Sequence, residues 1–429
     1  MFSSSPSRAS MFDTFGYSAR AVGMGNAMTA LGGDYDAVYY NPANVLLRGR
    51  AHVGLGLHLV APSFTFETLE GDARSRLPET QTGFHIGGVT PLGGFLNRQI
   101  GLGIAFSHPL STGTEVASID PAKPYFYRYQ GLPDKLIVAL ALAVEPVEWL
   151  RIGLGAQILA GFGGTVEASL SLTEGRFTSE RIDVSISPTA SPTAGFSVGP
   201  FDGIRFGATY RHRLALDYAL PVRVDIEEIG RLDVTVKGVS LFQPSQLALG
   251  LSWESAPAPS PGISTELGVT WEMWDDAPPA GADFELTIDD SLVRPGDAQT
   301  VLKAFGPTTP LGARDTLTPR VGIEWRPSGT WAVRGGYFFR PTPLPRPVYQ
   351  TNTLDASAHV FSLGGGVTLG DPTGITATPV HIDLGAQLTW LQRRFVQKLP
   401  DGEGGEPPGA YFFEGPVWHV VLDIRYDYQ

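Results

Sequence analysis

Most of the chain consists of segments in which apolar and polar residues alternate. Side chains of a β-strand point alternately to two faces, so each such segment has one apolar and one polar face. One such strand occurs in many soluble proteins, but a long series of them is typical of a transmembrane β-barrel. The final segment shows the pattern best, with Trp418, Val420, Leu422, Ile424, Tyr426 and Tyr428 on one face and Val417, His419, Val421, Asp423, Arg425 and Asp427 on the other.

The alternation predicts an all-β fold, in which residues 49–429 form a transmembrane antiparallel β-barrel of 14 strands. An even number of strands is usual for single-chain bacterial outer-membrane barrels. The predicted strands lie near 49–66, 79–91, 98–109, 132–145, 149–165, 182–198, 203–219, 241–254, 264–275, 317–326, 330–341, 357–369, 377–393 and 413–428.

The connectors between the predicted strands alternate between short and long. Short connectors of outer-membrane barrels face the periplasm and long ones face outside, so we expect both termini on the periplasmic side. The longest connector contains a stretch, Ala298–Phe305, that could form a short helix. The long connectors run near 67–78, 110–131, 166–181, 220–240, 276–316, 342–356 and 394–412.

The polar strand faces predict a charged lumen. An Arg or Lys facing lipid at mid-membrane costs roughly 2–4 kcal/mol, so ionised residues belong inside the barrel. We expect lumen charges at Arg205, Arg211, Arg320, Glu324, Arg334, Asp383, Asp423 and Arg425. Tryptophans near strand ends or on apolar faces suit the aromatic girdles of a membrane interface, namely Trp149, Trp253, Trp271, Trp274, Trp325, Trp331 and Trp418.

Composition agrees with a barrel and argues against several other classes. Charged residues make up 17% of the chain, below the roughly 25% of ordinary soluble domains. The chain has no Cys, which excludes disulfides and thiolate chemistry, and its net charge of −12 argues against nucleic acid as a partner. The first ten residues lack the apolar stretch of a signal peptide. We therefore expect that the signal of a Gram-negative outer-membrane protein has been removed.

Residues 1–48 interrupt the alternation and predict a compact segment, partly helical around Ala27–Leu31. This segment carries Ser18-Ala19-Arg20-Ala21-Val22-Gly23-Met24-Gly25 and Tyr40-Asn41-Pro42-Ala43. These residues resemble the start of FadL-type outer-membrane transporters of long-chain fatty acids. The resemblance continues through 145–153, 201–211 and 334–337. It departs from the family at Asn26, where Gly is usual, and at Asn44, where Gly often follows the Ala.

The resemblance implies that residues 1–48 form a plug, or hatch, shaped by Gly23, Met24, Gly25, Asn41, Pro42 and Ala43. It also implies that hydrophobic molecules are captured among extracellular loops, enter the barrel and leave sideways near a kinked third strand. The third strand here is Arg98–Pro109, in which Gly101, Gly103 and Pro109 could permit a kink or a break in pairing. Position and composition make Phe12, Phe15 and Tyr17 the candidate ligand contacts in the plug.

No pattern in the chain supports catalysis, a cofactor or a metal site. Gly195-Phe196-Ser197-Val198-Gly199 matches a nucleophile elbow, but it leads into a turn and another strand rather than a helix. The eight His residues lack metal-ligand spacing, and His52 and His58 are predicted to be polar residues of the lumen. The lumen arginines have two interpretations. They bind a substrate carboxylate, or, as we favour, they pair with Glu324, Asp383 and Asp423 and fill the barrel.

The predicted function is outer-membrane transport of hydrophobic small molecules similar to long-chain fatty acids, with lateral release through the barrel wall. The expected partners are outer-membrane lipids, a hydrophobic ligand or detergent in the barrel, and a protein that could bind the extracellular loops. The alternative is a scaffold in a surface, motility or secretion complex, acting chiefly through 276–316. Apolar residues lining the lumen beside the plug favour transport, whereas a lumen packed shut by ion pairs favours a scaffold.

Overall fold

The protein is described here by a computed structural model. The described residues are 14–68, 80–92, 99–110, 125–126, 128–129, 136–159, 163–167, 181–185, 188–226, 230–278, 283–288, 301–302, 311–347, 352–370, 378–397 and 410–428.

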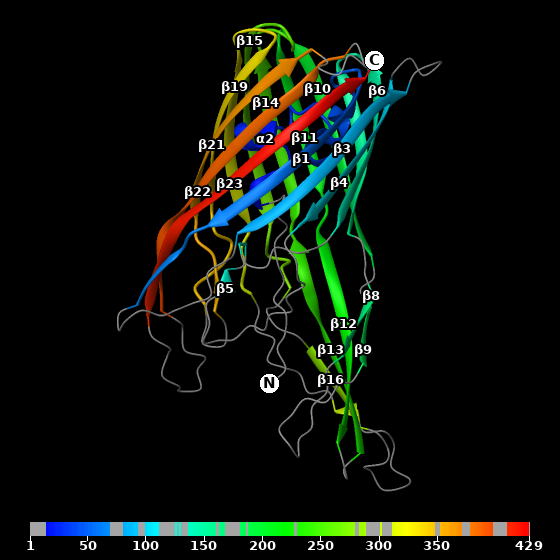
Figure 1. The fold of residues 1–429 in the computed structure, drawn as a ribbon, viewed down its shortest axis with the longest axis vertical. Coiled ribbons are helices and arrows are strands. Elements are labelled where there is room, and N and C mark those ends of the chain that lie inside the picture. Colours follow the sequence, from blue (N-terminus) through cyan, green and yellow to red (C-terminus); the bar gives the residue numbers. More distant parts are fainter. Residues whose placement is uncertain are drawn as a thin grey trace.

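One antiparallel sheet closes on itself into a barrel (Figure 1). It has fifteen strands, of which β2 (Thr65–Thr68) pairs only with the far end of the last strand, so fourteen form the wall. The closing pair runs from Ala51 opposite Tyr428 to Pro62 opposite Val417. The predicted 14-stranded barrel is confirmed. Its strands are β1 (Ala51–Pro62), β3 (Gln81–Leu92), β4 (Ile100–Pro109), β6 (Ile137–Val147), β7 (Leu150–Leu159), β10 (Thr189–Phe201), β11 (Ile204–Arg211), β14 (Ser245–Glu254), β15 (Gly262–Met273), β18 (Thr316–Arg326), β19 (Trp331–Arg340), β21 (Ala358–Leu369), β22 (Val380–Val396) and β23 (Tyr411–Tyr428).

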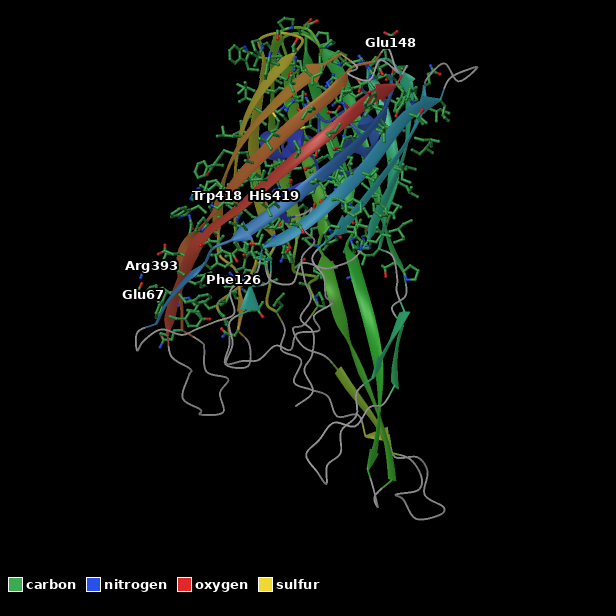
Figure 2. All side chains as sticks on the ribbon, viewed as in Figure 1. Glu67, Phe126, Glu148, Arg393, Trp418 and His419 are labelled. Atoms are coloured by element: carbon green, nitrogen blue, oxygen red, sulfur yellow. The ribbon has the colours of Figure 1, made fainter. Side chains whose placement is uncertain are left out.

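The two faces of the wall differ as the alternation requires. Trp418 on β23 is 51% exposed, whereas its neighbour His419 is fully buried inside; both are labelled in Figure 2. The outer face is covered with large apolar side chains such as Leu267 and Leu363, which suits a lipid environment. Trp274 departs from the predicted girdle, because it is buried and its indole N–H donates to Glu272 at 2.9 Å.

A second sheet extends beyond the barrel at the end of the long connectors (Figure 1). The prediction of a connector at 220–240 is therefore wrong, because β12 and β13 form a hairpin through this region. The sequence alternates there, with Val222 and Val224 on one strand and Val234 and Val236 on the other, and such β-branched residues favour strands. The sheet comprises β8 (Gly163–Glu167), β9 (Arg181–Ser185), β12 (Leu214–Ile226), β13 (Gly230–Gln243), β16 (Asp283–Ile288) and β17 (Val301–Leu302).

The helix expected within Ala298–Phe305 is absent from the part of that stretch that the structure describes. Val301 and Leu302 instead form β17 and pair with Thr287 and Leu286 of β16. Strand pairing satisfies their backbone groups, so no helix is needed for that purpose.

The described part of the N-terminal segment, 14–48, lies inside the barrel (Figure 1). It contains α2 (Ala19–Gly23), α3 (Ala37–Tyr40) and the 3₁₀ helix η1 (Pro42–Leu46). The helix predicted around Ala27–Leu31 is wrong, because Thr29, Ala30 and Leu31 form a turn and the two residues before them have no regular secondary structure. The reason is a tertiary contact: the backbone N–H groups of Thr29, Ala30 and Leu31 all donate to the carboxylate of Glu266 on β15, at 2.7, 3.0 and 2.6 Å.

The two ends of the described chain lie in different parts of the barrel. Tyr428, at the end of β23, lies at the short-connector end. Thr14 accepts a hydrogen bond from Arg340 at the long-connector end of β19. The predicted periplasmic position of the N-terminus concerns residues outside those described.

Five inward-facing glycines, each on a different strand, let the plug backbone touch the barrel wall. We call them the glycine ring. A Cβ at any of these positions would lie 2.2–2.4 Å from a backbone atom of the plug, which is closer than real Cβ atoms come. The plug can therefore dock this closely only because these five wall positions have no side chain. The ring consists of Gly153 (facing Ala43), Gly207 (Thr29), Gly322 (Met24), Gly336 (Gly25) and Gly385 (Ala19).

A first prediction compares two adjacent glycines of β19. In Gly336→Ala the new methyl group would lie 2.3 Å from Gly25 N, so the plug must shift, at a cost of about 1–3 kcal/mol for overpacking. Gly335 faces outward and a Cβ there would meet nothing nearer than 3.8 Å, so Gly335→Ala is the matched control. We expect Gly336→Ala alone to increase protease cleavage of the plug and ion conductance in planar bilayers. Equal behaviour of the two variants would contradict the close docking.

Candidate functional site: a plugged lumen with an ion-pair network and an aromatic cluster

The Asn41-Pro42-Ala43 motif joins the plug to the wall. The Asn41 side-chain oxygen accepts the N–H of Ala43 at 3.1 Å, which caps η1, and Pro42 occupies the first position of that helix. The Asn41 amide donates to Thr29 O at 2.8 Å within the plug and to Phe196 O of β10 at 3.1 Å. One side chain therefore fixes a helix start, a plug turn and a wall strand together.

Gly23, Met24 and Gly25 form the second close contact with the wall. Gly25 has φ +64°, where a glycine is favoured, and its Cβ would lie 2.9 Å from Tyr337 N. Asn26, at the position where the family usually has Gly, also has a left-handed φ, of 57°. Asn tolerates this conformation better than other side chains, and its amide donates to Phe15 O at 3.2 Å.

At the short-connector end, one plug carboxylate holds three arginines. Asp34 is bound by Arg20 at 3.3 Å, by Arg48 at 2.8 Å and by Arg425 of β23. Burial alone would raise the pKa of Asp34, but the neighbouring guanidinium groups, Arg425 foremost, hold it well below its usual range. The carboxylate is therefore ionised, and it ties the plug to the last strand.

A second carboxylate, Glu324 of β18, extends this network across the wall. It pairs with Arg20 of the plug at 2.9 Å and with Arg334 at 2.7 Å, and Arg334 continues to Asp383 at 2.5 Å. Breaking such a buried network by removing one partner typically costs 3–5 kcal/mol. The ion pairs thus lock the plug at this end of the lumen.

The structure places all eight predicted lumen charges on the inner face, where seven are buried and Arg320 is half-buried, and several of them contact the plug. Asp423 accepts from Tyr35 OH at 2.8 Å and from the N–H of Ala19 at 2.7 Å. Arg211 donates to Tyr39 O at 2.5 Å. Arg205 pairs with Glu254 at 3.4 Å, and Arg320 lies over the ring of Phe338 at 4.5 Å. The expectation that the lumen arginines pair with three carboxylates is thus met in part: Glu324 and Asp383 bind arginines, whereas Asp423 binds the plug.

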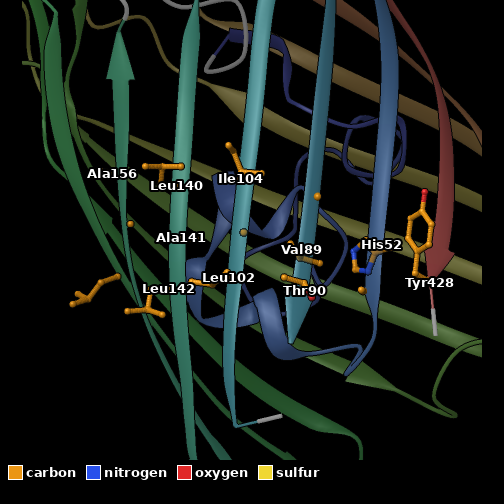
Figure 3. Close-up of a pocket in the computed structure, with 15 residues that line it drawn as sticks. His52, Val89, Thr90, Leu102, Ile104, Leu140, Ala141, Leu142, Ala156 and Tyr428 are labelled. Atoms are coloured by element: carbon orange, nitrogen blue, oxygen red, sulfur yellow. The ribbon is translucent and has the colours of Figure 1, made fainter. Parts of the chain in front are cut away.

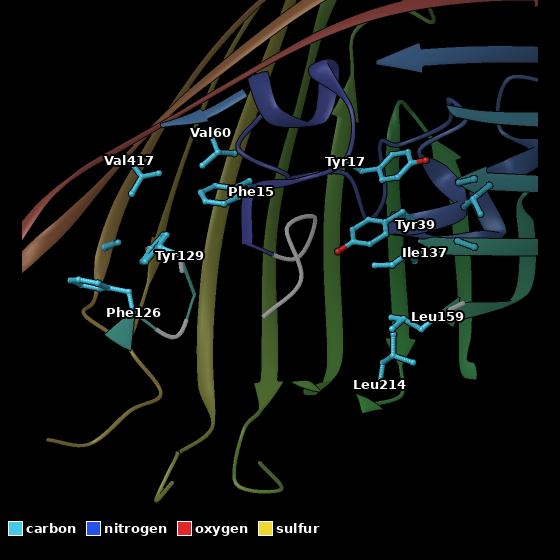
Figure 4. Close-up of a cluster of buried hydrophobic side chains, with 14 of the residues drawn as sticks. Phe15, Tyr17, Tyr39, Val60, Phe126, Tyr129, Ile137, Leu159, Leu214 and Val417 are labelled. Carbon is cyan, nitrogen blue, oxygen red and sulfur yellow. The ribbon is translucent and has the colours of Figure 1, made fainter. Parts of the chain in front are cut away.

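Buried aromatic side chains gather in the long-connector half of the lumen (Figure 4). Buried charges lie next to them: Arg128 pairs with Asp355 at 3.2 Å, and Arg340 donates to the Tyr129 hydroxyl. Phe15 of the plug, Tyr129 and Phe126 from the connector after β4, Phe64 after β1 and Phe413 of β23 form what we call the aromatic cluster. Neighbouring ring centroids are 4.4 Å apart for Phe64 and Phe126 and 6.1 Å apart for Phe15 and Tyr129. All five side chains are buried, so the cluster is closed in this conformation.

Of the candidate ligand contacts, Phe15 belongs to the aromatic cluster and Phe12 lies outside the described residues. Tyr17 instead contacts the wall, because its hydroxyl lies 3.2 Å from both Ile86 O of β3 and Phe106 O of β4. Sequence reasoning missed Phe126 and Tyr129. The dense aromatic run 125–129 within an otherwise polar connector was the available signal.

The predicted third strand, β4, is paired on both sides along its described length. Its partners run from Gly83 to Leu92 on β3 and from Ile137 to Val144 on β6. Gly101 and Gly103 make room for the plug, since a Cβ at these positions would lie 2.6 Å from Leu46 and 2.5 Å from Val38. Pro109 ends the strand, opposite Gly83. In this conformation the glycines of β4 therefore serve plug packing, and the strand has no break.

An apolar groove of about 750 Å³ lies on the outer wall over this same strand (Figure 3). Outward Leu102, Ile104, Leu140 and Leu142 border it, and Figure 3 shows them on neighbouring strands. The inward positions behind the groove are small, namely Gly103, Ala141 and Gly155. The wall is thus thin between the groove and the plug.

The described residues contain neither a candidate metal site nor a candidate membrane-spanning helix. No group of three or more His, Cys, Asp or Glu side chains there is arranged to hold a metal ion. None of the helices within these ranges has both the length and the apolar character needed to cross a bilayer.

Comparison with known proteins identifies the architecture. No family model matches the chain. Alkane uptake protein A of Marinobacter nauticus is 24% identical over 425 residues, covering 91% of this chain and 86% of that protein. The crystal structure of a Pseudomonas aeruginosa FadL homologue superposes with a TM-score of 0.59 at 14% identity, covering 96% of this chain and 98% of that one. The chain has the fold of a FadL-type barrel.

Structures of toluene transporters share the FadL-type fold. TodX of Pseudomonas putida has a TM-score of 0.58 at 14% identity, and TbuX of Ralstonia pickettii has 0.51 at 16% identity. They cover 97% and 98% of this chain, and 100% of each of their own chains. The fold and the apolar outer wall together indicate a bacterial outer-membrane protein.

A second prediction concerns the pH dependence of the plug. Burial, followed by the charge of Asp34, raises the pKa of Asp36 to about 6, although Ser18 donates to it at 2.5 Å. The ordinary pKa is about 3.9, so between pH 4 and 6 the folded protein keeps a proton that the unfolded chain loses. Asp36 therefore destabilises the fold increasingly through this window, by roughly 2–3 kcal/mol above it.

We expect Asp36→Asn to raise the thermal midpoint above pH 6 and to leave it unchanged below pH 4, as measured by circular dichroism on purified protein. Glu148 is exposed at the short-connector end of the barrel, so Glu148→Gln supplies the control. A shift of equal size at both pH values would show that ionisation of Asp36 does not cause the effect.

Proposed function

We propose that this protein carries hydrophobic small molecules across the outer membrane. The observation that carries the proposal is the aromatic cluster, buried in the lumen between the long connectors and the plug. A water-filled pore would have a polar lining at this level. Here five aromatic rings pack together and fill a region that we call the chamber. Buried ion pairs of Arg128 with Glu272 and Asp355 lie beside it, and the ion pairs that hold the plug lie at the opposite end.

The cargo class follows from this chamber and agrees with the named relatives. Alkane uptake and toluene transport are the activities in the names of proteins similar to this chain. An apolar molecule gains free energy by leaving water for aromatic surroundings, roughly 25 cal/mol for each Å² of apolar surface buried. Extended apolar molecules, such as hydrocarbons and long-chain fatty acid-like compounds, are therefore the proposed cargo, captured first among the long connectors.

Release sideways through the wall is the proposed exit. The groove over β4, the small residues behind it and the contacts of Val38 and Leu46 with Gly103 and Gly101 support this position. An apolar molecule that leaves there enters lipid directly and avoids the periplasmic water. The exit requires that β4 separate from a neighbouring strand while the plug side chains retract.

A third prediction tests the chamber. Phe413→Asn places an amide among the aromatic side chains, whereas Phe412→Asn changes the adjacent, outward residue of β23. Burial of a Phe side chain is worth about 1.5–3 kcal/mol, so Phe413→Asn should lower uptake about tenfold or more. Uptake of radiolabelled hexadecane and oleic acid by cells gives the measurement. Unchanged uptake in Phe413→Asn would contradict passage through the aromatic cluster.

A fourth prediction tests the exit with a reversible lock. Ile104 of β4 lies directly opposite Leu140 of β6, and the chain has no native Cys. A disulfide in Ile104→Cys/Leu140→Cys should stop uptake, and reduction should restore it, because the two strands can no longer separate. The matched lock Leu267→Cys/Val321→Cys joins β15 and β18 on another part of the wall. Equal inhibition by both locks, or by neither, would place the exit elsewhere.

The scaffold alternative stays a prediction. The six-stranded sheet beyond the barrel supplies a surface for a protein partner. Uptake that is insensitive to Phe413→Asn would favour this role.

A further inference from the structure

Three histidines from three neighbouring wall strands form a continuous hydrogen-bonded row. His58 of β1 lies between the other two: its Nδ1 is 3.0 Å from His419 Nε2, and its Nε2 is 2.6 Å from His85 Nδ1. His85 Nε2 is 2.8 Å from the hydroxyl of Tyr35 in the plug, which donates to Asp423 at 2.8 Å. All three imidazoles are buried. We call this set the histidine row.

With all three imidazoles neutral, the donors of the row can be assigned by counting hydrogens, and His85 Nε2 also faces Asp423 Oδ1 at 3.4 Å. The single hydrogen of the Tyr35 hydroxyl goes to Asp423, so its oxygen accepts from His85 Nε2. A neutral imidazole has one N–H and one acceptor nitrogen. His85 Nδ1 therefore accepts from His58 Nε2, and His58 Nδ1 accepts from His419 Nε2. Each ring carries its hydrogen on Nε2, and all the donors point toward Asp423.

In this assignment one ring nitrogen of the row, Nδ1 of His419, has no hydrogen-bond partner. It carries a lone pair, is buried, and has no hydrogen-bond partner among the described residues. An unmatched buried acceptor is unfavourable, because it has lost its hydrogen bonds to water. It also lies at the border of the apolar chamber, because the His419 and Phe15 ring centroids are 5.2 Å apart and Phe15 belongs to the aromatic cluster.

We propose that His419 Nδ1 is a polar anchor for cargo and accepts a hydrogen bond from a donor group at the end of an apolar chain. The ligand class is thus a long-chain alcohol, or a fatty acid in its undissociated form. A hydrocarbon has no donor for this nitrogen, and an ionised carboxylate presents only acceptors to it. The inference rests on the proposed transport function and adds to it a preference among cargoes.

The rest of the row supports this role. Because the other nitrogens are all engaged, His419 cannot turn its donor toward the ligand without breaking its bond to His58. The acceptor is thus held in one orientation. A hydrogen bond accepted at Nδ1 also polarises the bonds that lead to Tyr35 and Asp423, which strengthens a row of this kind. A ligand reaches the nitrogen when the aromatic cluster opens, and passage along the proposed route requires the same opening.

Three ligands of equal chain length test the anchor, namely 1-dodecanol, dodecane and dodecyl methyl ether. The ether keeps the oxygen but has no donor. Binding is measured to the full chain in lipid nanodiscs, by competition with radiolabelled 1-dodecanol and with empty nanodiscs subtracted. One net hydrogen bond predicts that the alcohol binds about fivefold more tightly than the other two ligands.

His419→Phe should abolish this preference while dodecane binding stays unchanged. General damage to the lumen would instead weaken all three ligands together. Thr389→Val, which removes a buried hydroxyl from the neighbouring β22, should keep the preference. If wild-type protein binds the alcohol and the ether equally, the anchor is wrong although transport stands. If it binds none of the three, the proposed function fails as well.

A measurement on the unmutated protein covers the case in which His419→Phe does not assemble. In histidine ¹⁵N-labelled protein, 1-dodecanol should shift the NMR resonance of one unprotonated Nδ1, because that nitrogen gains a hydrogen bond. Dodecane and the ether should leave it in place. Absence of an alcohol-specific shift would overturn the proposal.

Discussion

Backbone-to-backbone contact between the plug and the barrel is the constraint on which the rest of this structure depends. At Gly153, Gly207, Gly322, Gly336 and Gly385 the plug main chain lies where a Cβ would be. Glycine normally weakens a strand, but here its lack of a side chain allows the plug backbone and the wall backbone to approach closely. Once the plug is in this position, its N–H groups and side chains find their partners on the wall, including Glu266 beneath Thr29, Ala30 and Leu31.

Buried ion pairs then hold the plug at one end of the lumen. Asp34 and Glu324 gather arginines from the plug and from strands of the wall, and this network occupies the short-connector end. Buried ion pairs contribute little net stability, but they disfavour any arrangement that leaves one partner alone. They therefore suit the task of holding a plug in one position. The opposite half carries the aromatic cluster, which suits apolar cargo, beside a second ion-pair group of Arg128, Glu272 and Asp355.

Several features of this protein could be predicted from residues alone. Alternation with a period of two is local, so the fourteen strands and the inward position of residues such as Glu324 and Asp423 followed from the pattern. The helix expected around Ala27–Leu31 was wrong because a carboxylate on β15, distant in sequence, competes for those N–H groups. The hairpin of β12 and β13 was missed although its sequence alternates, because its length beyond the wall made it resemble a connector.

The candidate site was less accessible to sequence reasoning. His58, His85 and His419 are separated by 27 and 361 residues, and only the register of β1 with β3 and β23 brings them into a row. The aromatic cluster likewise combines a plug residue, a connector and the last strand. The plug motifs were visible in sequence, but their glycines acquire a purpose only against particular wall glycines.

By itself, then, the sequence determined the number of strands, the two faces of each strand and the presence of a non-alternating N-terminal segment. These depend on side-chain order along a single strand, where neighbours in sequence are neighbours in space. The tertiary structure alone decided which inward residues meet, which arginines the plug carboxylate collects and which histidine nitrogen is left over. Closing the barrel sets the register between strands, and the docked plug selects its partners from across the whole lumen.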